Sequence, residues 1–336
     1  MNEQALNQFH EYIVKHRDVL QEMLTKDDAE SKKLLKDASV QQIIAVMDEF
    51  KGLLEKIEHK NYGTCVVCQG EVELERLEQD CTTNVCLDCY SEEQLRELER
   101  DLELAAKVQK QLLPTCVPSV EGIEFAVRYE SAQAVGGDYY DFFTLKNGQQ
   151  GFVIGDVMGK GLAASMLMSN LQASLRILGP DYDRLENLAR HLNRLFRYNL
   201  KLIRFISLFL GAADLQKRKL HYCNAGHHAP LFWDTLKREI RWLTPTAPAI
   251  GLIAEPEFGL NTIRFNPGDM LLLYTDGLIE ARNQKNLEFG EKRLSAFMQE
   301  NHRLTAEKFL EMLWKSVKDF TIQPIDDTTL MVLKFS

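Results

Sequence analysis

The sequence predicts an α+β fold with antiparallel sheets, preceded by a helical region and a cysteine cluster. From about residue 119 onward, short runs rich in β-branched and aromatic residues are interrupted by stretches with helical periodicity. These strands and helices come in groups rather than in strict β-α-β order, which favours antiparallel sheets over a doubly wound parallel sheet. Before residue 119 the pattern differs, because amphipathic helices flank a stretch that holds five of the seven cysteines.

Residues 1–60 are predicted to form two amphipathic helices. Apolar side chains recur at three- and four-residue steps, first from Leu6 to Met23 and again from Ile43 to Ile57. The polar stretch "TKDDAESKK" between the two helices suits a turn. We therefore expect an antiparallel helical hairpin over residues 1–60.

Two CxxC pairs follow the hairpin. Cys65 and Cys68 form the first pair, and Cys86 and Cys89 form the second pair after 17 intervening residues. This spacing is typical of a four-cysteine site for one Zn²⁺ ion. The alternative is four unliganded thiols, since disulfides rarely persist in a reducing cytosol. Three further cysteines are expected to serve in packing: Cys81, Cys116 and Cys223.

Residues 93–114 are predicted to form a helical linker. Ser91 is the expected N-cap, glutamates occupy the first turn, and Pro114 ends the helix. Its heptad seam consists of Leu95, Leu98, Leu102, Ala105 and Leu112, with Gln109 as the polar member. Such a seam indicates a parallel homodimer through the linker, the alternative being that the stripe packs on the chain's own C-terminal domain.

The remaining segment, residues 115–336, is expected to form one domain. Its strand-like runs cover residues 123–130, 150–157, 206–214, 219–226, 270–277 and 328–335. Helical patterns cover residues 162–178, 183–202, 290–300 and 305–319.

Charge and hydropathy narrow the choice of partners. The net charge is −9. Residues 1–113 carry 24 acidic and 14 basic side chains, whereas residues 114–336 carry 25 acidic and 26 basic side chains. An acidic N-terminal third argues against direct contact with nucleic acid, which needs clustered Lys and Arg.

No apolar run approaches the roughly 18 residues that span a bilayer, and no signal peptide is visible. We expect a cytoplasmic protein without a membrane partner.

Five aspartates border the strand-like runs of the C-terminal segment. They are Asp138, Asp156, Asp276, Asp326 and Asp327. Taken alone, each aspartate is explained as a turn residue, because Asp is common beside Gly in turns. Several in the same setting suggest a shared site, and carboxylates without His or Cys suit Mg²⁺ or Mn²⁺. Two such ions can clamp a phosphoryl oxygen and activate a water.

The cysteine stretch resembles the DksA/TraR-type zinc finger. The matching residues in "NYGTCVVCQGEVELERLEQDCTTNVCLDCYSEEQLRELE" are Tyr62-Gly63 before the first CxxC, Arg76-Leu77 midway, and the second CxxC leading into a helix. The resemblance implies a zinc finger over residues 61–92. It also makes RNA polymerase a candidate partner of the preceding hairpin, whose predicted tip holds Asp27 and Asp28. A solvated turn is the alternative explanation of that acidic tip.

Six motifs between about residue 105 and residue 336 resemble the metal-dependent Ser/Thr protein phosphatases (PPM family) of the bacterial SpoIIE/RsbU-like branch. They are "AAKVQKQLLP", "VGGDYYDFF", "GDVMGKGLAASMLMS", "NAGHHAPLFW", "LLLYTDGLIEARN" and "DDTTLMVLKF", in the family's order. The resemblance implies two central antiparallel sheets flanked by helices. It also implies direct hydrolysis of phosphoserine or phosphothreonine, with an anti-anti-sigma (STAS-type) regulator as the expected substrate.

Carried over position by position, the resemblance assigns metal ligands for two Mn²⁺ or Mg²⁺ ions. Asp156 would bridge both ions. Asp138 and the carbonyl of Val157 would hold one ion, and Asp276 and Asp326 would hold the other. These four aspartates are the expected catalytic residues.

Other matched positions support the site or depart from the family pattern. Gly137 would let the backbone approach an ion closely, and Asp327 would lie behind the ligands. Many relatives have Ser and His where this chain has Met158 and Lys160, and some have Arg at Gln133. Lys160 is a candidate for contact with an anionic substrate, the alternative being a solvated lysine.

His227 and His228 in "NAGHH" are candidates for a general acid, although this loop more often shapes the site in the family. The predicted function is a metal-dependent protein phosphatase regulated through the N-terminal zinc module. The alternative is a non-catalytic regulator that engages RNA polymerase or another partner through the hairpin and finger.

Overall fold

The computed structural model describes residues 6, 10, 13, 14, 48, 50–59, 61–79, 81–199, 205–321 and 326–336. Most of the predicted hairpin, including its acidic tip, lies outside the described residues, as does the end of the helix predicted over residues 183–202. The chain divides into two compact units, Met1–Glu99 and Arg100–Ser336.

The first unit is built around the cysteines. Residues 50–58 are helical, and Thr64 and Glu71 form an isolated antiparallel bridge between the turns. The helix α4 (Leu74–Gln79) and the short 3-10 helix η1 (Leu87–Cys89) complete the described part. Its small core gathers apolar side chains around two of the cysteines: Ile13, Phe50, Leu53, Leu54, Ile57, Tyr62, Cys65, Val72, Leu77 and Cys86.

The helix α5 (Glu92–Leu112) begins with a capping box, and the division between the units falls within it. The Ser91 hydroxyl oxygen accepts from the Gln94 N–H at 3.2 Å, and the Gln94 side-chain oxygen accepts from the Ser91 N–H at 2.9 Å. These reciprocal bonds satisfy two backbone donors that a helix start otherwise leaves unpaired. The prediction of Ser91 as N-cap is therefore confirmed.

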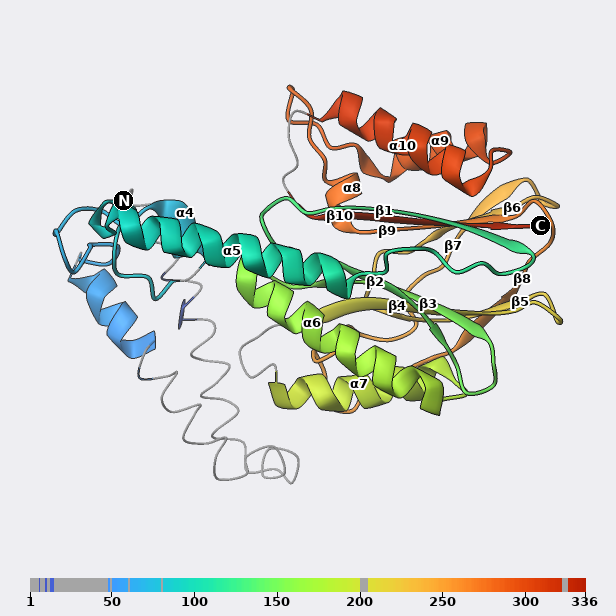
Figure 1. Ribbon diagram of the computed structural model, residues 1–336, viewed down its shortest axis with the longest axis horizontal. Helices are drawn as coiled ribbons and strands as arrows, with labels where there is room; N and C mark the ends of the chain where they lie inside the picture. The colour runs from blue at the N-terminus through green and yellow to red at the C-terminus, as the bar shows by residue number, and fades with distance from the viewer. Residues whose placement is uncertain are drawn as a thin grey trace. The chain divides into compact units, whose positions relative to one another are not determined.

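Two five-stranded antiparallel sheets stack on each other in the second unit, Arg100–Ser336 (Figure 1). One sheet has the order β1 (Ile123–Glu130), β10 (Thr328–Phe335), β9 (Met270–Tyr274), β6 (Leu231–Asp234) and β7 (Glu239–Trp242). The other has the order β2 (Tyr139–Thr144), β3 (Gln150–Val157), β4 (Ile206–Asp214), β5 (Lys219–Ala225) and β8 (Asn261–Arg264).

Helices cover the outer face of each sheet. The helices α6 (Gly161–Leu178) and α7 (Leu185–Asn199) pack on the sheet that contains β3, with η2 (Gly179–Asp181) between them. The helices α9 (Gly290–Asn301) and α10 (Ala306–Phe320) pack on the other sheet, which α8 (Asp276–Ile279) also joins (Figure 1). A third core, with Phe152, Phe209 and Leu333 among its members, fills the space between the sheets.

This four-layer arrangement confirms the predicted sandwich. The central strands are buried on both faces, and their sequences are accordingly apolar almost without interruption, as in "MLLLY" and "ISLFLGAAD". None of the helices in the described part of the chain combines the length and the apolar composition of a membrane span.

Candidate functional site

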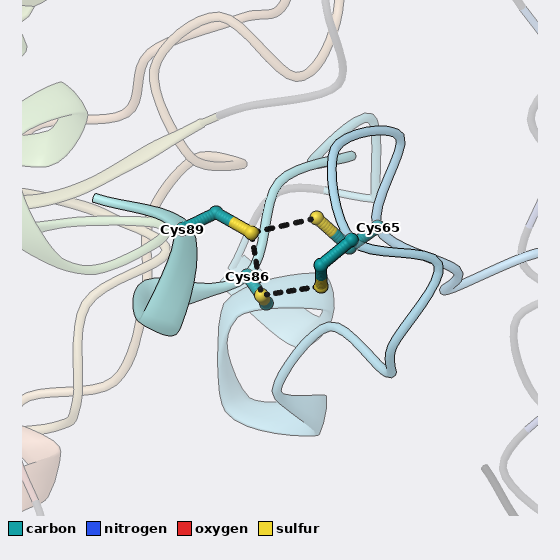
Figure 2. A group of neighbouring side chains, drawn as sticks. Cys65, Cys86 and Cys89 are labelled. Atoms are coloured by element: carbon teal, nitrogen blue, oxygen red, sulfur yellow. Dashed lines mark hydrogen bonds between the residues drawn. The ribbon is translucent and has the colours of Figure 1, made fainter. Parts of the chain in front are cut away.

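The four predicted zinc ligands converge in the first unit. The sulfur atoms of Cys65, Cys68, Cys86 and Cys89 all lie within 4.8 Å of one another. Dashed lines in Figure 2 join the sulfur of Cys89 to the sulfurs of Cys65 and Cys86. These two separations are 3.6 Å and 3.5 Å. A tetrahedral zinc site with Zn–S bonds near 2.3 Å places its sulfurs about 3.8 Å apart, so the cluster fits this ion. Cys81 is not a member of the group.

Backbone N–H groups point at the cysteine sulfurs. The Val67 N–H donates to the Cys65 sulfur at 3.4 Å, and the Gly70 N–H donates to the Cys68 sulfur at 3.3 Å. Backbone hydrogen bonding, with the amide of Cys68 as the largest contribution, lowers the pKa of the Cys65 thiol to about 6. The thiolate form, which is the form that binds metal, is therefore favoured at this position.

Polar contacts hold the two cysteine turns together. The Glu73 carboxylate accepts from the Leu87 N–H at 2.8 Å. The Arg76 guanidinium donates to the Val85 carbonyl at 2.6 Å and lies 5.6 Å from the centre of the Tyr90 ring. Arg76 lies between the two CxxC sequences, and these contacts give it a structural role between the turns.

In the second unit, the sheet of β2 and β3 brings two of the aspartates to one edge. Asp138 directly precedes β2, and Asp156 is the penultimate residue of β3. Because Tyr139 pairs with Gly155 in antiparallel register, the start of β2 and the end of β3 lie side by side.

The other sheet contributes the remaining aspartates in the same way. Asp276 is the first residue of α8, just after β9, and Asp326 and Asp327 lie just before β10. The pairing of Leu330 with Tyr274 sets the end of β9 beside the start of β10.

Contacts across the sandwich fix Asp138. Its Oδ2 accepts from the hydroxyl of Thr275, which directly follows β9, at 2.7 Å and from the hydroxyl of Thr329 in β10 at 2.6 Å. Its Oδ1 is buried and has no hydrogen-bond partner among the described residues. A buried carboxylate oxygen without a partner is costly, and a bound cation would satisfy it. The site therefore fits a hard divalent cation at Asp138.

Asp327 faces the protein rather than a ligand. One of its carboxylate oxygens accepts from the Ala132 N–H at 2.8 Å and the Ser131 hydroxyl at 3.1 Å. The other accepts from the Gly137 N–H at 2.7 Å. Asp327 thus holds the loop before Asp138 in place.

Two glycines are required by close approach of the backbone. A Cβ atom on Gly137 would lie 2.9 Å from the carbonyl oxygen of Val157, the predicted backbone ligand. A Cβ atom on Gly277 would overlap the carbonyl oxygen of Asp327. Larger residues at either position would displace the strand ends that bear the aspartates.

The clustered carboxylates raise one another's pKa values. Burial, followed by the charges of Asp276 and Asp326, raises the pKa of Asp156 to about 7. Burial and the charge of Asp156 raise the pKa of Asp138 well above its usual value. Burial and the charge of Asp326 raise the pKa of Asp276. The concentrated negative charge is an environment that a divalent cation would stabilise.

His227 cannot serve as the general acid. Its Nε2 lies 3.1 Å from the Tyr274 carbonyl, which only accepts, so Nε2 carries the proton and Nδ1 accepts from the Ser207 hydroxyl at 2.9 Å. Burial lowers the pKa of the ring to about 3, which keeps it neutral. His227 instead links the two sheets beside Asp156, whose antiparallel partner is Ser207. The proposal for His228, whose ring stacks on Tyr274, stays a prediction.

Sequence inspection missed the role of Gln109. Its side-chain amide donates to the Gly136 carbonyl at 2.6 Å, and its oxygen accepts from the Gly136 N–H at 3.0 Å. Gln109 is buried, so it binds the loop before Asp138 rather than serving as the polar member of an exposed heptad seam. The Arg176 side chain bonds the Leu112 carbonyl and Asp141, which anchors the end of the same helix. The only feature of the sequence that indicates this role is the presence of a glutamine within the apolar stripe of the helix.

The fold and the strand-end aspartates define a phosphatase domain of the PPM type. The family model "Stage II sporulation protein E (SpoIIE)" matches residues 146–336, more than half of the chain. The chain therefore belongs to the SpoIIE family.

Individual relatives agree with this assignment. The phosphoserine phosphatase RsbU of Bacillus subtilis is 26% identical over 240 residues, covering 70% of each chain. Protein IcfG of Synechocystis is 29% identical over 234 residues, which cover 62% of this chain and 37% of IcfG. This chain thus spans well under half the length of that relative. The SiaA-PP2C domain of Pseudomonas aeruginosa shares the fold, with a TM-score of 0.62 at 18% identity over 72% of this chain and 98% of that domain.

Proposed function

We propose that this protein is a metal-dependent Ser/Thr protein phosphatase that acts on a phosphorylated signalling regulator. The observation that carries the proposal is the buried, unpaired Oδ1 of Asp138 within a group of carboxylates that raise one another's pKa values. Such a group suits two Mn²⁺ or Mg²⁺ ions. The homology to a phosphoserine phosphatase supports the choice of phosphomonoester.

The proposed role of each residue comes from the resemblance to the PPM family, carried over position by position. Asp156 would be shared by the two ions, Asp138 and the Val157 carbonyl would hold one ion, and Asp276 and Asp326 would hold the other. The bound ions supply Lewis acidity and an activated water for attack on phosphorus. The hydrogen bonds to Asp138 Oδ2 leave its Oδ1 free to act as a ligand.

The substrate is proposed to be an anti-anti-sigma regulator of the STAS type. The proposal of this substrate rests on the similarity to RsbU, which is named a phosphoserine phosphatase and 70% of which is covered by this chain. A phosphoserine on a compact protein domain is the chemical group that the site would receive.

The cysteine cluster is proposed to bind one Zn²⁺ and to form a DksA/TraR-type finger that regulates the phosphatase. Its sulfur separations of 3.5–3.6 Å support a tetrahedral ion.

The regulatory proposal includes a homodimer through α5. Leu98 and Leu102 are exposed large apolar residues on this helix, and burying them against a second copy would be favourable. The protein should sediment as a dimer at micromolar concentration, and Leu98→Asp with Leu102→Asp should give a monomer with altered hydrolysis. A monomeric wild type would rule this arrangement out.

The phosphatase proposal is tested by hydrolysis of p-nitrophenyl phosphate and of a phosphoserine peptide with and without Mn²⁺. Asp276→Asn should reduce the metal-dependent rate about a thousandfold, because a catalytic ion contributes several kcal/mol to transition-state stabilisation. The exposed Asp183→Asn is the matched control and should keep the wild-type rate. Equal rates in the two variants would reject the proposal.

A further inference from the structure

Lys160 pairs with one of the proposed metal ligands. Its ammonium nitrogen lies 2.8 Å from Oδ2 of Asp326, and the two side chains are 44% and 30% exposed. Its charge also acts on Asp156, where it lowers the pKa against the larger, raising effects of burial and of neighbouring carboxylates. Lys160 therefore takes part in the charge balance of the carboxylate site.

The backbone around Lys160 is tightly defined. Lys160 directly precedes α6 in an extended conformation, between Gly159 at φ +108° and Gly161 at φ +67°. Both flanking angles lie in the region that favours glycine, so the turn fixes where the lysine side chain starts. The side-chain oxygen of Gln133 lies 3.3 Å from the position of a Cβ on Gly161, so a second polar side chain borders the same turn.

A divalent cation and an ammonium group cannot share Asp326 without mutual repulsion. A cation bound at Asp326 would therefore displace the ammonium of Lys160. The lysine side chain is partly exposed and has a flexible four-carbon stem, so it can turn toward another anion nearby. The anion that enters this site in the proposed function is the phosphate group of the substrate.

We infer that Lys160 is an exchangeable counter-ion that links metal binding to phosphate binding. Without a cation at Asp326 it neutralises that carboxylate; with a cation there it binds a phosphate oxygen of the substrate. The inference rests on the proposed phosphatase function for the identity of its substrate. It makes Lys160 a residue that determines phosphate affinity in this chain.

The first test measures Mn²⁺ binding to the full-length protein by isothermal titration calorimetry. Lys160→Met should bind Mn²⁺ about five- to tenfold more tightly, because the competing ammonium is gone. Lys160→Arg should stay near the wild type, since a guanidinium can also pair with Asp326. The matched control is Lys217→Met, which removes a lysine paired with Asp214 at 3.0 Å in the turn between β4 and β5, and it should change nothing.

The second test measures binding of inorganic phosphate to the same variants in saturating Mn²⁺. Lys160→Met should bind phosphate about tenfold more weakly, and Lys160→Arg should restore the affinity. For a phosphoserine peptide, the loss should appear mainly in KM rather than in kcat.

Unchanged Mn²⁺ affinity or unchanged phosphate affinity in Lys160→Met would overturn the inference. If the wild type bound both ions but hydrolysed no phosphoserine peptide, the proposed function would fail. The calorimetric comparison would still decide the role of Lys160.

Discussion

The cysteine cluster and the carboxylate site differ in the sequence separation of the residues that form them. Cys65 and Cys89 are 24 positions apart and belong to two neighbouring turns. Asp138 and its partner Thr329 are 191 positions apart; Asp138 directly precedes β2 of one sheet, and Thr329 lies in β10 of the other. The cysteines converge through local turns, whereas the carboxylates converge only when two five-stranded sheets have paired and stacked.

The two sites also differ in the size of the hydrophobic core that surrounds them. The described core around the cysteines is small, while the carboxylates stand on a sandwich with three apolar cores. We therefore expect metal to hold the cysteine module together, and the sandwich to persist with or without its ions.

Loss of zinc should unfold the cysteine module. Cys65→Ser should remove one equivalent of zinc and the associated folding free energy, which is on the order of 10 kcal/mol in small zinc modules. Residues around the cysteines should become sensitive to limited proteolysis, while residues 115–336 stay protected. The exposed Cys116→Ser is the control. Retained zinc in Cys65→Ser would show that the assignment is wrong.

The charge cluster should make the metal-free protein less stable as pH rises. The pKa of Asp156 is about 7 in the folded state and about 4 in the unfolded state. Between about pH 4 and pH 7, the folded state therefore binds a proton at Asp156 that the unfolded state has lost. Stability should therefore fall from about pH 4 to pH 7, by up to about 4 kcal/mol from this group.

Urea unfolding of metal-free protein at pH 5, 6, 7 and 8 measures this loss. Asp156→Asn should reduce it, because the buried amide carries no charge. A wild type that becomes more stable between pH 5 and pH 7 would contradict the electrostatic account.

Gln109→Leu should destabilise the second unit by about 2–4 kcal/mol, because it leaves the N–H and carbonyl of Gly136 without their partner. Gln111→Leu changes an exposed glutamine on the same helix and should have little effect. Chemical denaturation of both variants measures the difference. Equal midpoints would show that the contact with Gly136 contributes no stability.

Thr275→Val should weaken Mn²⁺ binding about ten- to hundredfold, since the variant loses the hydroxyl that orients Asp138. The exposed Thr262→Val removes a hydroxyl that pairs with His221 and serves as the control. Calorimetric titration with Mn²⁺ measures the effect. If Thr275→Val bound Mn²⁺ as tightly as the control, orientation of Asp138 by this hydroxyl would not matter.

The same contrast explains which features the sequence reveals. The CxxC spacing encodes a local geometry, so the cluster of four sulfurs could be predicted from the sequence alone. The strands β1, β3, β4 and β10 could be predicted residue by residue, because each is a run of eight or nine residues rich in apolar side chains. The short strands β6, β7 and β8 carry four residues each and no clear alternation, so they were missed. The sequence between Asp138 and Asp156 is strand-like, but the bounds of β2 could not be predicted because the strand follows Asp138 without an intervening turn signal.

The surroundings of the aspartates could not be predicted in the same way. Neither threonine that bonds Asp138 stands out in the sequence, since each reaches it only through the stacking of two sheets. The contact between Gln109 and Gly136 depends on how α5 packs, and a heptad pattern describes one helix without naming its partner. Motifs thus indicated the candidate ligands, and the fold supplied the groups that orient them.

The most direct test of two separate metal sites follows zinc content and phosphoserine hydrolysis in one sample. Mild chelation should abolish hydrolysis while one equivalent of zinc remains, and added Mn²⁺ should restore the rate without changing the zinc content. The account would be contradicted if hydrolysis persisted in the absence of Mn²⁺ and Mg²⁺, or if it followed the zinc content instead.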